Sequence, residues 1–220
     1  MTAHRLSRST YRTPDRPAQP FLSGAGFDDL TMERGRVHEV CGIARRTLIA
    51  ILAARCPGPI FWIAPSWQAA RLNPEGACRL FDPARLTFLD PLRNEDLLWC
   101  MEEVLRSGAV PLVVADLPGT PGLTPVRRLH LAAETGGTLT GHWPLGVILT
   151  PGQGGAGGVE SRWHIAPDHG VNTRRAWRLD RLRARTAPPR TWAIRPKEGK
   201  LQIEDWMPQT TGPLRHQKTA

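Results

Sequence analysis

The chain lacks the features that mark several common classes of protein. Its four cysteines are far apart, form no CxxC pair and have no histidine at metal-ligand spacing, which argues against a zinc site or a disulfide framework. Its longest apolar run, Leu48 to Ala54, is too short to span a bilayer, and the N-terminus has no apolar stretch of signal-peptide length. These absences predict a cytoplasmic protein with reduced thiols, no bound metal and no contact with a membrane.

Lysine is also scarce. Lys197, Lys200 and Lys218 are the only lysines among 29 basic residues, the rest being arginine, and the formal net charge is +9. Such a basic balance is compatible with binding to nucleic acid or to an acidic protein, and it does not distinguish between them. With 220 residues the chain can bury one substantial core, so we expect a single domain with loose ends.

The two ends of the chain differ in composition from its middle. Residues 1–30 begin with a stretch rich in arginine, serine, threonine and proline, so we expect a disordered basic arm there. Residues 207–220 are similar and are expected to form a flexible tail. Residues 31–206 carry alternating strand and helix patterns and are predicted to form one domain.

The clearest pattern lies between Asn94 and Leu117. Asn94 is a candidate helix N-cap, and Gly108 suits the position just after the helix end. Apolar residues at helical spacing lie between them. The run from Val110 to Val114 is then continuously apolar, as expected of a strand covered on both faces, and it leads to Asp116.

Repetition of this strand and helix alternation predicts an α/β fold, with a mostly parallel sheet and flanking helices. Further strands are expected near residues 36–40, 60–64, 86–89 and 146–150, and further helices near 45–55, 66–80 and 125–135. After a glycine-rich loop at 152–158, interpreted as a flexible connector, short strands follow without helices between them, near 162–165, 177–182, 192–194 and 201–203. This last part predicts a C-terminal antiparallel meander.

Asp116 should lie at the carboxyl edge of the sheet, where open α/β proteins bind ligands. In nucleotide-dependent ATPases an aspartate placed there orients Mg²⁺, although strand-end aspartates often only cap the next turn. The turn between the first core strand and its helix holds Gly42, Arg45, Arg46 and Thr47, in the position where a P-loop binds phosphate through helix N-terminal amides. Together these residues form a candidate nucleotide or phosphate site.

This candidate site departs from a working P-loop. The motif GxxxxGK[ST] requires a second glycine and a lysine, but here the second glycine is missing and Arg46 stands where the lysine is expected. A hydrolytic ATPase also needs a carboxylate to orient the attacking water, and the stretch Ile63 to Gln68 contains no acid. We therefore expect a degenerate site with no required cofactor and no efficient ATP hydrolysis, while ATP binding stays open. In the alternative interpretation Arg45 and Arg46 are simply solvated residues of the helix start.

Two groups of arginines are candidates for contact with DNA or a protein partner. One lies on the helix near 125–135, which Thr124 should cap and Gly136 should follow. The candidates are Arg127 and Arg128 on that helix, and Arg162, Arg174, Arg175, Arg178, Arg181 and Arg183 in the C-terminal strands. Arginines beside aromatic residues can contact phosphates and stack on bases, whereas a plain solvated basic face is the alternative.

Several stretches, taken together with their order and spacing, resemble known families. Residues 95–116 and 181–194 resemble parts of the RecA recombinase core. Within that superfamily the chain is most similar to the ImuA family of bacterial mutagenesis cassettes, through residues 35–40, 60–63, 98–110, 127–134 and 161–163. The resemblance implies a RecA-like core and a role in SOS-induced translesion synthesis. It also implies an ImuB-like Y-family protein and an error-prone replicative-type DNA polymerase as partners, with RecA and DNA as further candidates.

The leading hypothesis from the sequence is a non-catalytic RecA-like adaptor that is cytoplasmic and associates with the nucleoid during DNA damage. One alternative is a divergent DNA-stimulated ATPase that uses Arg46, Thr47 and Asp116. Another is a SulA-like inhibitor of cell division, since that family resembles a RecA core without a nucleotide site.

Overall fold

The computed structural model of the chain describes residues 16–24, 27–68, 72–168 and 176–207. Its main strands are β3 (Val37–Cys41), β4 (Ile60–Ile63), β5 (Leu86–Leu89), β6 (Leu112–Asp116), β7 (Leu145–Thr150), β8 (Ser161–Pro167), β9 (Trp177–Ala184), β10 (Arg190–Lys197) and β11 (Lys200–Asp205). Its helices are α1 (Arg45–Arg55), α2 (Pro74–Ala77), α3 (Asn94–Ser107) and α4 (Leu123–Thr140), with a 3₁₀ turn at Pro83–Arg85.

In this described part the strands form a nine-stranded sheet in the order β11-β10-β9-β8-β3-β7-β6-β4-β5. The six strands from β8 to β5 in that order are parallel, and β9, β10 and β11 continue the sheet as an antiparallel meander. The prediction of a mixed α/β fold, with a mostly parallel sheet and a C-terminal antiparallel meander, is confirmed.

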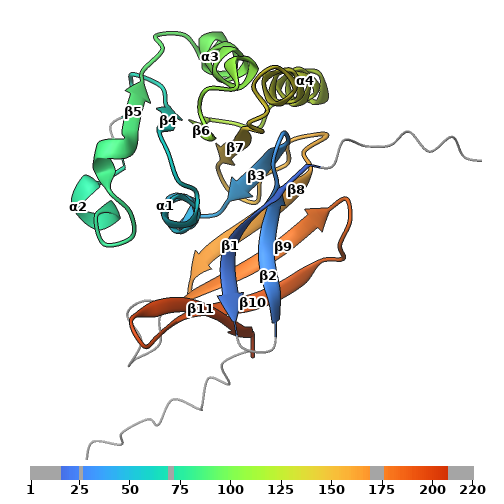
Figure 1. The fold of residues 1–220 in the computed structure, drawn as a ribbon. Coiled ribbons are helices and arrows are strands. Elements are labelled where there is room, and N and C mark those ends of the chain that lie inside the picture. The colour runs from blue at the N-terminus through green and yellow to red at the C-terminus, as the bar shows by residue number, and fades with distance from the viewer. Residues whose placement is uncertain (1–15, 25–26, 69–71, 169–175, 208–220) are drawn as a thin grey trace, which may run out of the picture.

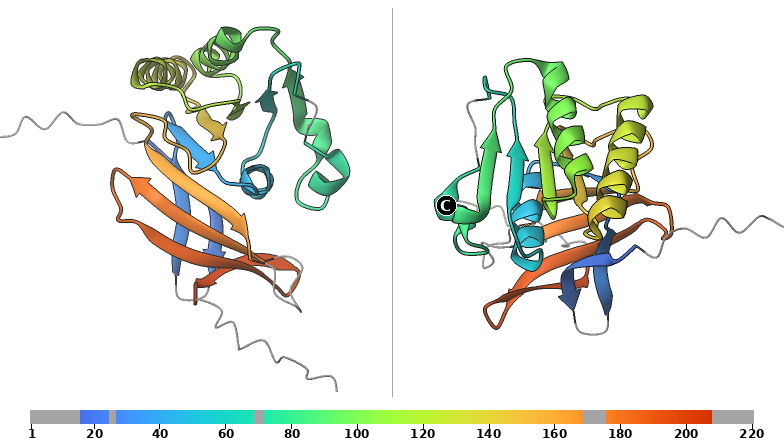
Figure 2. Two further views of the ribbon diagram at one scale, coloured as in Figure 1. Left: turned by 180° about the vertical axis from the view of Figure 1, so that it is seen from behind. Right: turned by 45° about the horizontal axis from the view of Figure 1, so that its top comes forward.

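The two faces of the parallel sheet are covered by different elements. Helices α3 and α4 lie side by side over one face, and α1 covers the other (Figures 1 and 2). Strand β6 shows why its sequence is continuously apolar: Leu112 and Val114 belong to the core on the α1 side, whereas Val113 and Ala115 belong to the core beneath α3 and α4. The same alternation turns the next side chain, Asp116, toward α1.

A hairpin precedes the main sheet. Strands β1 (Ala18–Gly24) and β2 (Phe27–Glu33) pair antiparallel and pack against α1 and β11, where Phe21, Leu22, Leu30 and Met32 are buried. The disordered arm expected at residues 1–30 is therefore wrong from residue 18 onward, because the hairpin contributes a few apolar side chains to the main core. Residues 1–15 lie outside the described part, as do all but Met207 of the expected flexible tail.

Several predicted helix ends are wrong in detail. Helix α3 starts at Asn94 with Arg93 at the N-cap and no side-chain cap, while Gly108 follows its end with φ of 65° as expected. Helix α4 is longer than predicted, with Gly122 in place of Thr124 at its N-cap and Gly136 inside it. At Gly136 a β-carbon would lie 2.2 Å from the Leu105 carbonyl oxygen, so glycine there permits close packing of α4 on α3.

The helix predicted at residues 66–80 is mostly absent. Within that stretch the described residues are helical only over Pro74–Ala77, while residues 69–71 lie outside the described part. Proline has no backbone N–H and is favoured at a helix start rather than inside one, and Gly76 lowers helix propensity further. Among the described residues, no helix has the length and apolar character needed to cross a membrane.

Candidate functional site

The structure brings Asp116 together with the N-terminus of α1. The Asp116 side chain is only 1% exposed, and its Oδ2 accepts hydrogen bonds from Arg46 Nε at 2.8 Å and from Gln68 Nε2 at 3.2 Å. The Arg46 Nη2 atom lies 2.7 Å from the same oxygen, and Arg45 Nη2 lies 3.5 Å from Oδ1. Two guanidinium groups therefore neutralise this buried carboxylate.

The turn that leads from β3 into α1 is also closed by its own hydrogen bonds. The amide of Gly42 donates to the Gly152 carbonyl at 3.0 Å, and the amide of Ala44 donates to the Ile165 carbonyl at 3.3 Å. Gly42 has φ of 91°, and a β-carbon there would lie 2.3 Å from the Ile165 oxygen. Helix N-terminal amides bind anions only when they point at the ligand, and these two are engaged with the chain itself.

Thr47, the fourth residue predicted for this turn, does not join the cluster. No hydrogen bond in the described part of the chain links its hydroxyl to Asp116. Thr47 instead lines a cavity of about 660 Å³ with Phe21, Ile51 and Leu201, in a place bounded by β1, α1, α2 and the β10–β11 hairpin. Asp116 is not among the residues that line this cavity.

The arrangement at Asp116 is better suited to holding the edge of the sheet together than to chemistry. A carboxylate that orients Mg²⁺ must be open to the ion, whereas Oδ2 here faces three donor nitrogens and Oδ1, which has no hydrogen bond in the described part of the chain, is buried 3.5 Å from Arg45 Nη2. Over residues 16–24, 27–68, 72–168 and 176–207, no group of three or more His, Cys, Asp or Glu side chains is placed to bind a metal ion.

The arginines predicted on α4 lie on the outer face of that helix. Arg127 and Arg128 are exposed, and Arg128 Nη2 pairs with Glu102 of α3 at 2.8 Å. Arg128 therefore joins the two outer helices. Val126 and Leu129 turn inward, which sets the opposite face of the helix outward.

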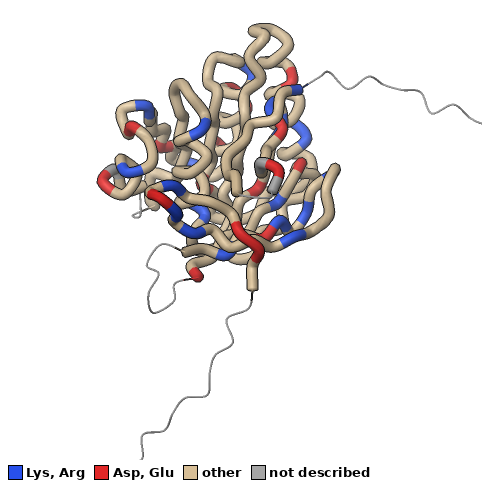
Figure 3. Tube along the Cα trace, turned by 60° about the horizontal axis from the view of Figure 1, so that its bottom comes forward, with Lys and Arg blue, Asp and Glu red and all other residues tan. Residues whose placement is uncertain are grey.

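The arginines of the C-terminal strands do not form one uniform surface. Arg162 pairs with the buried Glu39, and Arg178 pairs with Asp180 at 2.9 Å. Arg181 lies 5.1 Å from the Trp192 ring centroid, and burial together with nearby Arg190 lowers its pKa. Arg183 is exposed, while Arg174 and Arg175 lie outside the described residues. Figure 3 shows basic and acidic positions interspersed along the molecule.

A buried carboxylate that sequence reasoning missed is Glu39 in β3. Its Oε1 accepts hydrogen bonds from Thr150 Oγ1 at 2.7 Å and from the Gly155 amide at 2.9 Å, and the Ala156 amide lies 3.2 Å from both oxygens. Arg162 completes the pair. The glycine-rich loop is thus anchored at its middle, and its interpretation as a flexible connector is wrong there. The only local signal was an acid, next to a histidine, in a short strand whose other residues are valine and cysteine.

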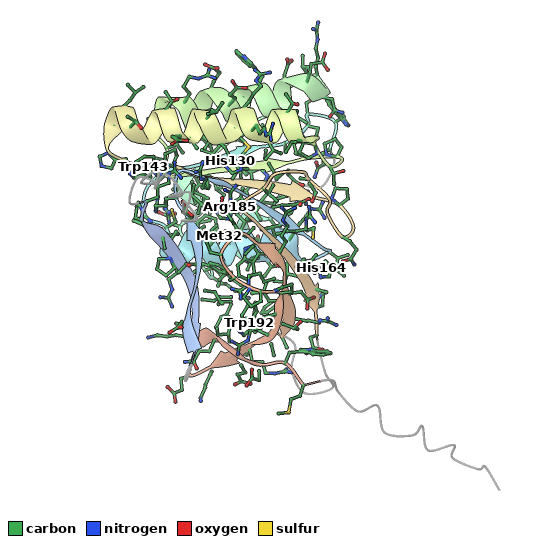
Figure 4. All side chains as sticks on the ribbon, turned by 90° about the vertical axis from the view of Figure 1, so that its right-hand side faces the viewer. Met32, His130, Trp143, His164, Arg185 and Trp192 are labelled. Carbon is green, nitrogen blue, oxygen red and sulfur yellow. The ribbon has the colours of Figure 1, made fainter. Side chains whose placement is uncertain are left out.

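Two buried histidines, one in β3 and one on α4, form hydrogen bonds around the start of β3. His130 on α4 accepts from the Val37 amide at 3.3 Å and donates to the Gly158 carbonyl at 3.0 Å. His38 lies 2.7 Å from the Ser161 hydroxyl and donates to the Glu33 carbonyl. Burial lowers the pKa of each to about 4. Figure 4 shows His130 beneath the outer helices, far from Trp192 at the opposite end of the molecule.

Comparison with known proteins identifies no relative of the chain. Models of known protein families give no match to the chain, and a search of curated proteins finds no similar sequence.

Proposed function

We propose that the protein is a non-catalytic, RecA-like adaptor of the ImuA type, which supports SOS-induced, error-prone translesion synthesis together with an ImuB-like partner. The observation that carries the non-catalytic part is the contact between Arg46 and Asp116, which occupies the carboxylate that a nucleotide-bound Mg²⁺ would need. The proposed role in translesion synthesis and the ImuB-like partner rest on the resemblance of the sequence to the ImuA family.

The contacts of Asp116 with Arg45, Arg46 and Gln68 support the non-catalytic part of this proposal. A Mg²⁺-nucleotide complex would have to displace Arg46 from a carboxylate that is almost fully buried. Displacement would break both contacts of Arg46 to Oδ2 and leave its guanidinium without this partner, which lowers the affinity for such a complex. The hydrogen bonds of the Gly42 and Ala44 amides would also have to break before phosphate could bind there.

The architecture supports the RecA-like part of the proposal. A parallel strand, β3, leads through a short turn into α1, and β6 ends in an acid beside that turn. These are the relative positions that a phosphate loop and a metal-orienting aspartate take in nucleotide-dependent ATPases. We infer that the scaffold persists while the groups that would drive ATP turnover are absent.

A binding assay with the purified ImuB-like partner tests the adaptor. The full-length chain should bind the partner without ATP, and its ATP hydrolysis should not exceed that of Asp116→Ala. A failure to associate would overturn the adaptor. Hydrolysis that disappears in Asp116→Ala but persists in the exposed control Glu103→Ala would favour the ATPase alternative. Filamentation of cells on overexpression would favour the inhibitor of cell division.

A further inference from the structure

Large apolar side chains are exposed in three successive connections at the carboxyl edge of the parallel sheet. Ile43 follows β3 and is 82% exposed, Trp67 follows β4 and is 55% exposed, and Leu92 follows β5 and is 81% exposed. Single exposed apolar residues are common on proteins, but several at the same edge of a sheet indicate a binding surface. We call Ile43, Trp67 and Leu92 the apolar rim.

The segments that carry the apolar rim are joined by contacts. The amide of Ser66, next to Trp67, donates to the Pro91 carbonyl at 3.2 Å, so the segments after β4 and β5 lie side by side. Gln68 donates to Asp116, and Asp116 in turn accepts from Arg46 at the start of α1. The apolar rim and the polar residues Arg46, Gln68 and Asp116 therefore belong to one continuous edge of the sheet.

The two carboxylate oxygens of Asp116 differ in their contacts. All three short contacts to Asp116 fall on Oδ2, whereas its buried Oδ1 has no hydrogen bond in the described structure. Arg45 makes two longer contacts: Nη2 lies 3.5 Å from Oδ1 of Asp116, and Nη1 donates to the Gly42 carbonyl at 3.4 Å. Two arginines thus face one carboxylate, which leaves an excess of positive charge at this edge.

We propose that this edge binds a segment of the adaptor's protein partner in which apolar side chains flank a carboxylate, and this proposal rests on the adaptor function. The carboxylate would pair with Arg45, while the apolar residues would cover Ile43, Trp67 and Leu92. Two arginines against one aspartate leave positive charge for a further carboxylate, and arginine binds carboxylates through parallel N–H donors. A phosphate ligand fits less well, because the amides of Gly42 and Ala44 are already bonded within the chain.

The test measures the affinity of the full-length protein for the purified partner by isothermal titration calorimetry. The double variant Ile43→Ser/Leu92→Ser removes two exposed rim side chains, and the control Leu139→Ser removes a side chain that is 74% exposed on α4. We expect the double variant to weaken binding at least tenfold and the control to bind as the wild type does. Arg45→Gln should also weaken binding about tenfold, and an added ATP analogue should leave affinity unchanged.

The outcomes separate this inference from the adaptor function. If the wild type and the rim variant bind equally well, the docking site is elsewhere while the adaptor stands. If the wild type does not bind, both proposals fall. If the ATP analogue displaces the partner in proportion to its concentration, the edge is a phosphate site and the inference is wrong. Circular dichroism of each variant shows that a loss of binding is not a loss of folding.

Discussion

Glu39 in β3 and Arg162 in β8 form a buried ion pair between neighbouring parallel strands, across 123 positions of sequence. Glu39 is fully buried, and the same carboxylate accepts hydrogen bonds from Thr150 of β7 and from amides of the following loop. One side chain therefore connects three strands and fixes the path of the chain from β7 to β8.

We predict that Glu39→Gln lowers the free energy of unfolding by about 2–4 kcal/mol. The amide would lose the charge that pairs with Arg162 and would place N–H donors against other donors. Urea denaturation measures the change, and hydrogen exchange at Gly155 and Ala156 should become faster. The exposed Glu103→Gln on α3 is the matched control. A stability within about 0.5 kcal/mol of the wild type would contradict the anchoring role.

The limits of sequence reasoning follow from these contacts. Strand β6 and helix α3 could be predicted because their apolar spacing is local, and Gly108 marks the helix end by its own chemistry. The role of Glu39 could not be predicted, because it depends on which strands become neighbours. The β1–β2 hairpin escaped prediction for a similar reason: its few apolar residues are buried by packing against separate elements, among them α1, β8 and β11.

The sequence predicts which residues belong to the candidate site, but not which contacts these residues make. The strand order places Asp116 beside the start of α1, and alternation along β6 turns its side chain toward that helix. The sequence left open whether Arg45 and Arg46 are solvated or engaged. Their packing onto Asp116 depends on distances between separate elements, and so does the turning of Thr47 toward a different cavity.

We predict that Arg46→Ala destabilises the protein more than Arg45→Ala does, by about 1–3 kcal/mol. Arg46 places two nitrogens on Oδ2 of Asp116, whereas Arg45 reaches Oδ1 only at 3.5 Å. Urea denaturation of both variants, of Asp116→Ala and of the Arg46→Ala/Asp116→Ala double variant provides the measurement. The double variant should be more stable than the sum of the single changes implies. Strict additivity would show that the two side chains do not stabilise each other.

We predict that the cysteines differ widely in reactivity. Burial, with Glu39 nearby, raises the pKa of the Cys41 thiol to about 12, and this thiol donates a hydrogen bond to the Trp163 carbonyl. Cys78 is exposed. Because the thiolate is the reactive form, iodoacetamide at pH 8 should alkylate Cys78 at least roughly 100-fold faster than Cys41. Mass spectrometry of digests checks the order, and labelling in urea should equalise the two sites. Equal rates in the native protein would contradict the burial of Cys41.

The two buried histidines predict a loss of stability in mild acid. Burial lowers the pKa of His38 and His130 to about 4, against an ordinary value near 6.5, so the unfolded chain binds more protons than the folded chain between those values. The stability is fully present above pH 6.5 and should fall as the pH drops toward 4. Protonation of His130 would also remove its Nδ1 as acceptor for the Val37 amide. Urea midpoints measured from pH 7.5 to 4.5 give the slope, and His130→Gln should make that slope shallower, since glutamine does not titrate. An unchanged slope in this variant would show that His130 does not contribute to the acid sensitivity.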